Sequence, residues 1–375
     1  MEVKVMLAAG HDPRRRALPR LRRGSGIGGP YARERDPMWQ PRRNREMIVT
    51  ALEEKPILTG YAIPDLPFLR LRLALESQDD AWLPPYKGSL LRGAFGHALR
   101  RAVCSMGPRQ PCETCSLNRA CVYTRLFEAF AWPEPPPYLH GQPAAPRPFV
   151  FEPLDERRDF SPGDHLQFDL LLFGEAVTLQ AFAVLAVERM AEAGLGARRF
   201  PFRLTRASHQ DAAGRWHVGY EQGGRQWSEV AAVNRCDALP LDDERLRLHL
   251  VTPLRIKEKG RFVNQLTFPT LAFRMLRRAL EVAHFHVPGA AVDWNVDAYL
   301  EQADAVRVTD AELSWLDWER YSNRQRAKMR LGGVVGALTL EGPLSPFHGL
   351  LRVAEVLHVG KGTTFGLGKI CVGEK

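Results

Sequence analysis

The sequence predicts an α+β protein built from two halves that each run β-α-β-β-α-β. Two observations lead to this fold class. Short segments alternate apolar with polar residues, as strands do, and longer ones repeat apolar residues every three or four positions, as helices do. With some gaps, both kinds of segment follow one another in the same order in the two halves of the chain. A chain of 375 residues, of which 45% are hydrophobic, is long enough to bury two cores.

The first half opens with a strand at 66–75, whose leucines lie on one side and Arg70 and Arg72 on the other. A helix from Ser89 to about Val103 follows it. The other elements expected in this half are strands at 149–152, 165–173, 203–207 and 216–220 and a helix at 176–193.

The second half repeats this order from a strand at 245–251. Its first helix is introduced by Pro269, a residue favoured in the first turn, and runs to about His284. We place the boundary near Leu239–Asp243, which gives domains at 64–243 and 244–375. The other elements expected in this half are strands at 313–318, 324–330, 334–340 and 369–372 and a helix at 347–357.

The first 63 residues are predicted to form a basic, disordered extension. Positions 1–46 hold 12 Lys and Arg against 5 Asp and Glu, a net +7 of the chain's +9, without apolar periodicity. One interpretation is an RNA-binding arm; we favour a solvated tail, or an upstream extension before a start at Met38 or Met47. The sequence shows no secretory signal and no apolar run long enough to span a bilayer, so we expect a cytoplasmic protein with no membrane partner.

Four glycines gather near the end of the chain, at Gly360, Gly362, Gly366 and Gly368, with Lys361 between the first two. The backbone amides of such a loop can approach phosphates closely, because glycine has no side chain. The loop follows an expected helix and precedes the last strand, which is the reverse of the order in dinucleotide and P-loop sites. The pattern therefore indicates a loop that holds a polyanion.

This order of helix, glycine loop (358–368) and strand resembles the C-terminal signature of the RAMP superfamily of CRISPR-associated proteins. It is most similar to the pre-crRNA-processing endoribonucleases, the sixth Cas family. The stretches at 85–96 and 318–325 and the pair Gly332-Gly333 also carry the resemblance, which spans about residue 64 to the end. It implies two tandem ferredoxin-like (RRM-like) domains, with CRISPR repeat RNA (pre-crRNA) rather than DNA as the ligand.

The resemblance also implies an endoribonuclease that cleaves RNA without a catalytic metal. The ribose 2′-OH attacks the adjacent phosphorus and the 5′-oxygen leaves, giving a 2′,3′-cyclic phosphate and a 5′-OH. The alternative is a non-catalytic RAMP subunit that binds RNA in a CRISPR effector complex with other Cas subunits. Two complete halves and a histidine on the exposed side of the first helix favour the enzyme.

His97 is the leading candidate for general acid or base. On a helical wheel, apolar residues fill the side that faces the sheet, while Gly93, Gly96, His97 and Arg100 share the other. The small residues let an RNA backbone approach an imidazole that titrates near neutral pH, although a surface histidine without a role fits the pattern too. Arg92 and Arg100 are assigned to RNA binding. Further catalytic candidates are Lys87 as a cation for the phosphoryl charge, Tyr86 and Tyr321 as proton carriers, and His358 as a second-choice histidine.

Cations occupy every second position from Arg324 through Arg326 and Lys328 to Arg330. At strand spacing these side chains lie on one face about 6–7 Å apart, close to the spacing of phosphates along a nucleic-acid strand. We therefore assign them to RNA binding, together with Lys361 and the four glycines of the loop. The tryptophans at 315 and 318 are expected in a core rather than on bases.

Four of the six cysteines gather in the insertion 104–121. A cytoplasmic protein favours metal binding over disulfides, and a Cys-x-x-Cys pair with two further thiols suits tetrahedral zinc. An iron–sulfur cluster would use the same ligands, and we favour zinc. Four protein ligands leave no open position, so the zinc would be structural and would stabilise a segment too short to bury a core. The ligands are expected to be Cys104, Cys112, Cys115 and Cys121.

Overall fold

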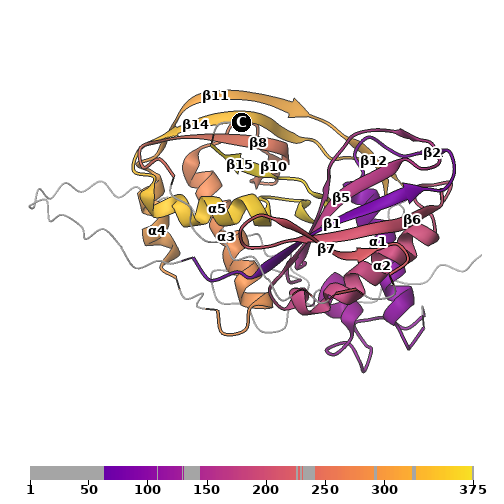
Figure 1. Ribbon diagram of the computed structural model, residues 1–375. Coiled ribbons are helices and arrows are strands. Elements are labelled where there is room, and N and C mark those ends of the chain that lie inside the picture. The colour runs from indigo at the N-terminus through magenta and orange to yellow at the C-terminus, as the bar shows by residue number, and fades with distance from the viewer. Residues whose placement is uncertain are drawn as a thin grey trace, which may run out of the picture. The chain divides into compact units, whose positions relative to one another are not determined.

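The computed structural model describes residues 63–107, 109–128, 130, 144–224, 227–228, 230, 241–290, 294–322 and 327–373. Residues 47–375 form one compact unit with two antiparallel sheets as its main layers (Figure 1). Residues 1–62 of the predicted extension lie outside the described residues.

The first sheet has the strand order β3-β5-β1-β6-β7. Four leucines on one side of β1 are fully buried and pack with apolar residues of the two helices that cover this face, as the alternation predicted. The sheet combines two β-α-β units, β1-α1-β3 and β5-α2-β6, whose strands alternate across it. This is the ferredoxin-like order, and β7 is added at one edge. The elements are β1 (Phe68–Ser77), α1 (Gly88–Val103), β3 (Phe149–Pro153), β5 (His165–Phe173), α2 (Gln180–Glu192), β6 (Phe202–Gln210) and β7 (Trp216–Glu221).

The second sheet has the order β11-β14-β8-β15, which is the same interleaved arrangement. Its first helix begins as predicted, because Thr267 accepts a hydrogen bond from the amide of Thr270 and Pro269 lies in the first turn. The elements are β8 (Arg245–Leu254), α3 (Phe268–His286), α4 (Val296–Ala303), β11 (Arg307–Leu316), β14 (Gly333–Glu341), α5 (His348–Leu357) and β15 (Ile370–Val372).

Short elements that the sequence analysis did not predict lie between these. Within the stretch predicted as one strand at 324–330, residues 327–330 form the second arm of a hairpin, and 324–326 lie outside the described residues. The other short strands have too few residues to show a period. Helical turns lie at η1 (Thr124–Glu128), η3 (Gly174–Leu179), η4 (Ser345–Phe347) and η5 (Thr363–Phe365). The small pairs are β2 (Ala81–Trp82) with β4 (Asp159–Phe160), β9 (Lys257–Glu258) with β10 (Arg261–Phe262), and β12 (Glu319–Ser322) with β13 (Ala327–Arg330).

The two halves share apolar core. Phe68, Val150, Leu171 and Phe173 come from the first sheet but cluster with the buried residues of the second half. The predicted boundary at 243/244 remains a prediction, since 231–240 lie outside the described residues. In the described part of the chain, none of the helices is long and apolar enough to cross a membrane.

Candidate functional site

The start of α1 lies against the glycine loop. The hydroxyl of Tyr86 donates a hydrogen bond to the carbonyl oxygen of Phe365 in η5. A Cβ on Gly88 would lie 1.8 Å from that same oxygen, so only glycine allows the helix to begin this close to the loop. The guanidinium of Arg92, one turn further along α1, lies 5.7 Å from the ring centre of Phe365. Two motifs of the sequence, the stretch 85–96 and the glycine loop, are thus brought together.

The loop glycines are required by the packing of the loop itself. Gly360, Gly362, Gly366 and Gly368 have φ angles of 83°, 86°, 83° and 72°, which favour glycine. A Cβ on Gly366 would lie 2.4 Å from the carbonyl oxygen of Phe151, and one on Gly368 would lie 1.8 Å from that of Val359. The amides of Gly366 and Gly368 donate to carbonyl oxygens within the protein, so these two glycines hold the loop in place. Gly360, Lys361 and Gly362 form the more accessible part of the loop.

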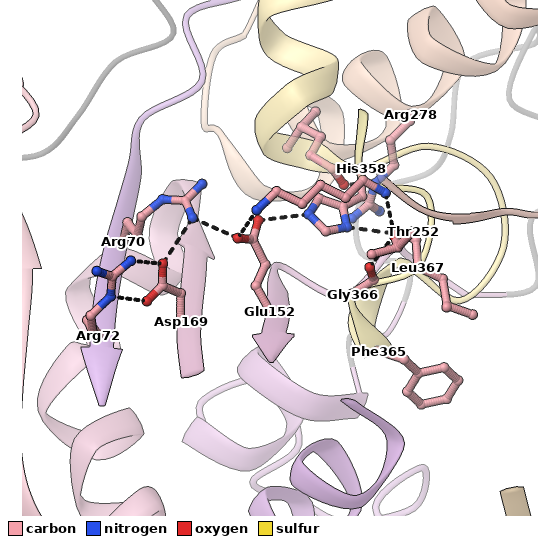
Figure 2. Close-up of polar contacts among 12 residues, drawn as sticks. Arg70, Arg72, Glu152, Asp169, Thr252, Arg278, His358, Phe365, Gly366 and Leu367 are labelled. Atoms are coloured by element: carbon pink, nitrogen blue, oxygen red, sulfur yellow. Dashed lines mark hydrogen bonds and ion pairs between the residues drawn. The ribbon is translucent and has the colours of Figure 1, made fainter. Parts of the chain in front are cut away.

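A buried chain of charged side chains fastens the loop to the first sheet (Figure 2). Glu152 on β3 is 3% exposed and accepts from His358 Nε2 at 2.8 Å and from Lys369 Nζ at 2.7 Å. The same carboxylate accepts from Arg70 at 2.8 Å, and Arg70 also donates to Asp169 at 3.2 Å. Arg72 closes the chain with bonds of 2.8 and 3.0 Å to Asp169.

Strand register explains this chain of charges. Asp169 lies opposite Arg72 of β1 and opposite Glu152 of β3, so all three side chains share one face of the sheet. Burial by itself would raise the pKa of Glu152, but its hydrogen bond and charge interaction with His358, then the charges of Arg70 and Lys369, hold that pKa well below its ordinary value. Glu152 is therefore an ionised carboxylate inside the protein.

His358 is part of this packing rather than of an open surface. Its side chain is fully buried, and its φ of 58° places it in the left-handed region where α5 ends. Nδ1 donates to the carbonyl oxygen of Leu367 at 3.2 Å, and Nε2 donates to Glu152. Both ring nitrogens thus lie at hydrogen-bond distance from oxygen atoms inside the protein.

Lys87 and Tyr86 are also built into the structure. The Lys87 side chain is fully buried, and its Nζ donates to the carbonyl oxygens of Pro85 and Asp155 and to the Asp155 carboxylate, at 3.1–3.3 Å. The ring of Tyr86 stacks on Trp318, with 3.8 Å between centroids. Burial, then the negative charge of Glu152, raises the pKa of Tyr86, so its hydroxyl stays protonated at neutral pH.

His97 lies on the exposed side of α1, as predicted. A Cβ on Gly93, one turn earlier, would meet nothing within 4 Å, so there is open space beside the imidazole. The prediction for Gly96 was wrong: it is buried, and a Cβ there would lie 2.2 Å from the ring of Phe127. Arg100 donates to the carbonyl oxygen of Gln110 at 2.8 Å and so supports the cysteine-rich insertion.

Residues 248–370, which contain β13, α5 and the glycine loop, match the family model of the CRISPR-associated endoribonuclease Cas6. This segment of the chain resembles Cas6. A second family model, described as an N-terminal domain, matches residues 66–232.

Individual proteins give weaker matches than the Cas6 family model. An uncharacterized protein of Archaeoglobus fulgidus is 29% identical over 115 residues, which are 31% of this chain and 37% of that relative. The match thus spans little more than a third of the curated relative. A solved Cas6 of Thermus thermophilus is 17% identical, with a TM-score of 0.46 and coverage of 84% of this chain and 100% of that one. A Cas6 product complex is 17% identical, with a TM-score of 0.48 and coverage of 82% and 99%.

The predicted basic strand at 324–330 falls partly on β13. Lys328 and Arg330 lie on its backbone, where they pair with Tyr321 and Glu319 of β12, whereas Arg324 and Arg326 lie outside the described residues. Trp318 is half-buried against Tyr86, but Trp315 is 44% exposed, so its predicted place in a core was wrong. The general tendency of aromatic residues to fill a core does not hold for Trp315, because it lies on β11, an edge strand whose residues are mostly exposed.

The four cysteines of the insertion are free and half-buried. Cys112 lies close enough to Cys104 and Cys121 for their charges to affect its pKa, which burial raises above the usual range. Among the described residues, however, the side chains of His, Cys, Asp and Glu do not gather in threes as a metal ion requires. The zinc site therefore stays a prediction from the spacing in the sequence.

Proposed function

We propose that this protein is a pre-crRNA-processing endoribonuclease, which binds CRISPR repeat RNA across α1 and the accessible part of the glycine loop. The observation that carries the proposal is the contact between two motifs far apart in the chain. The start of α1 lies directly on η5 within the segment that matches the Cas6 family model. RNA lying on Gly360–Gly362 would extend toward the exposed face of α1.

In the proposed reaction His97 moves one proton. As base, it takes the proton of the ribose 2′-OH, whose oxygen then bonds to the adjacent phosphorus while the bond to the 5′-oxygen breaks. As acid, it supplies the proton that the leaving 5′-oxygen gains. Both assignments end in a 2′,3′-cyclic phosphate and a 5′-OH. Lys361, which is exposed on the loop, would offset charge on the phosphoryl oxygens.

A second candidate function is RNA binding without cleavage, in a complex with other Cas subunits. The burial of Lys87 and His358 favours RNA binding without cleavage, because it leaves His97 with few accessible side chains that could assist it in the reaction. Incubating the purified protein with its own repeat RNA, in EDTA, separates the two. The enzyme leaves fragments ending in a cyclic phosphate, whereas tight binding of intact RNA supports the binding subunit. Cleavage that stops in EDTA would contradict the metal-independent reaction.

A further inference from the structure

The hairpin β9–β10 carries a concentration of positive charge that the proposed site does not use. Arg255, Lys257, Lys259 and Arg261 occupy every second position, and Glu258 is the acidic residue among them. Lys259 and Gly260 form the turn with φ angles of 46° and 82°, as a tight hairpin requires. Lys257, Lys259 and Arg261 are all exposed.

Three of the hairpin's cations, Lys257, Lys259 and Arg261, are exposed and differ from many surface arginines in their surroundings. Several exposed arginines elsewhere form ion pairs, such as Arg206 with Glu221 at 2.6 Å and Arg247 with Glu312 at 3.1 Å. In the part of the chain that the structure describes, no carboxylate lies within ion-pair distance of Lys257, Lys259 or Arg261. Like charges held this close repel one another, so an anion that arrives here is bound favourably.

Two aromatic side chains, Phe262 and Trp315, lie beside these cations. Phe262 of the hairpin lies under Arg255 and Lys257, at 4.6 and 4.9 Å, and its ring centre is 6.4 Å from that of Trp315. Gly332 leaves room for the indole, since a Cβ there would lie 2.7 Å from its Nε1. Trp315 keeps 44% of its surface exposed, so it offers a stacking surface next to the charges.

The hairpin is directly connected to the glycine loop. Arg255 forms an isolated parallel bridge with Gly360, and its carbonyl oxygen accepts the amide of Lys361 at 3.0 Å. A Cβ on Gly333, where β14 begins, would lie 2.8 Å from the Arg255 side chain. The charged surface therefore continues from the loop toward the end of β13.

We propose that Lys257, Lys259, Arg261 and Trp315 form a second RNA-binding surface, the hairpin surface, which takes a single-stranded segment of the substrate. The cations hold successive phosphates and Trp315 stacks on one base. The segment is single-stranded because bases in a duplex are already stacked and do not expose their faces to a side chain. This inference rests on the proposed function and names a further part of its substrate.

The test compares two double variants by fluorescence anisotropy on repeat RNA with a single-stranded flank. Lys257→Ala/Arg261→Ala removes two exposed cations of the hairpin surface, and Arg109→Ala/Arg198→Ala removes two exposed arginines elsewhere. Each single-strand phosphate contact contributes about 0.7 to the slope of log K against log salt, so the hairpin variant should lose about 1.4 of that slope and the control none. Trp315→Ala should weaken binding by roughly 5- to 150-fold, since stacking on one base is worth about 1–3 kcal/mol.

Ultraviolet crosslinking with peptide mapping gives an independent readout. We expect the RNA to crosslink to Trp315. An excess of single-stranded RNA should abolish this crosslink, whereas an excess of duplex RNA should not. If the wild type binds and cleaves the RNA while both hairpin variants behave like the control, the inference fails and the proposed function stands. Equal competition by duplex RNA would overturn the assignment to single strands. If the wild type binds no repeat RNA, the proposed function and this inference both fail.

Discussion

His97 is the exposed histidine of α1, so its imidazole can be removed without opening a core. We expect His97→Ala to lower the single-turnover cleavage rate by about a hundredfold or more, because acid–base catalysis contributes about 10²–10⁴-fold. The affinity for repeat RNA should stay nearly unchanged. Rapid-quench cleavage assays and anisotropy titrations measure the two quantities separately.

His165→Ala is the matched control, because His165 is an exposed histidine on β5 and should be neutral in both assays. Normal cleavage by His97→Ala would contradict its assignment and leave Tyr321 as the next candidate from the sequence analysis, since Tyr86 and His358 are engaged inside the structure.

Glu152 holds both ends of the glycine loop, because it accepts hydrogen bonds from His358 and Lys369. Removing one member of a buried ion pair costs about 3–5 kcal/mol, so Glu152→Gln should lower the free energy of unfolding in urea by roughly that amount at pH 7. The pKa of Glu152 is depressed in the folded protein. Its contribution is therefore complete above the ordinary value of 4.5 and declines as the pH falls through the folded value.

The wild type should consequently lose stability more steeply than Glu152→Gln as the pH falls below about 4.5. Glu192→Gln, at an exposed ion pair with Arg189, is the control and should leave stability and its pH dependence nearly unchanged. Parallel acid profiles for wild type and Glu152→Gln would show that Glu152 is not the group responsible.

Sequence analysis found the residues at the ends of the buried charge chain but not the chain itself. The alternation in β1 placed Arg70 and Arg72 on one face, and His358 stood beside the glycine loop. Glu152 and Asp169 carried a usable signal, since each is a single carboxylate in an apolar strand. Their partners could not be predicted, because strand register is set by tertiary pairing. In the structure that register brings Asp169 opposite both Arg72 and Glu152.

At the scale of elements, the glycine loop depends on contacts that a methyl group would block. Gly366→Ala should lower the melting temperature more than Gly163→Ala, although their φ angles, 83° and 90°, carry the same penalty of about 1–2 kcal/mol. The difference is the contact with Phe151, because a Cβ on Gly163 meets nothing within 4 Å. Differential scanning calorimetry measures both shifts.

We expect the loss for Gly366→Ala to be at least twice that for Gly163→Ala, and RNA binding to weaken with it. Equal shifts would mean that the loop yields at this contact, so that its glycines serve another purpose.

The cysteine-rich insertion is predicted to hold one zinc ion through Cys104, Cys112, Cys115 and Cys121. Elemental analysis of the purified protein should find about one zinc per chain, and a chelator should expose the insertion to protease. Cys371→Ser, outside the insertion, is the control and should leave the zinc content unchanged. Iron with sulfide and a visible absorption band would reverse the assignment, and a stable protein without metal would end it.

Long periodic elements were predicted well. The strand at 165–173 and the helix ending at Leu357 coincide with β5 and the end of α5. The hairpin β9–β10 and the strand β12 were missed because these strands are two to four residues long and carry too few positions for a period, whereas β13 lies within the strand predicted at 324–330. The alternating cations of the first hairpin were visible in the sequence, but only its exposure and its contact with Gly360 give them meaning.

At the scale of the whole molecule, most of the net charge is carried by residues 1–46, which contribute none of the residues of the proposed site. Deleting residues 1–46 removes a net +7 of the chain's +9. We expect the shortened protein to keep its melting temperature and cleavage rate, since residues 47–375 form one compact unit. Anisotropy titrations over a range of salt concentrations provide the check: a markedly smaller salt slope after the deletion would favour the RNA-binding arm.

The bond between Glu152 and His358 joins residues that are 206 positions apart in the chain. During synthesis at about 5–20 residues per second, His358 is added roughly 10–40 seconds after Glu152. Throughout that interval Glu152, Phe68 and Val150 lack the neighbours that bury them. Until the second half is made, the first half therefore exposes apolar residues that the folded protein buries. A chaperone that binds these residues during synthesis should raise the yield of folded protein more than one that acts after release from the ribosome.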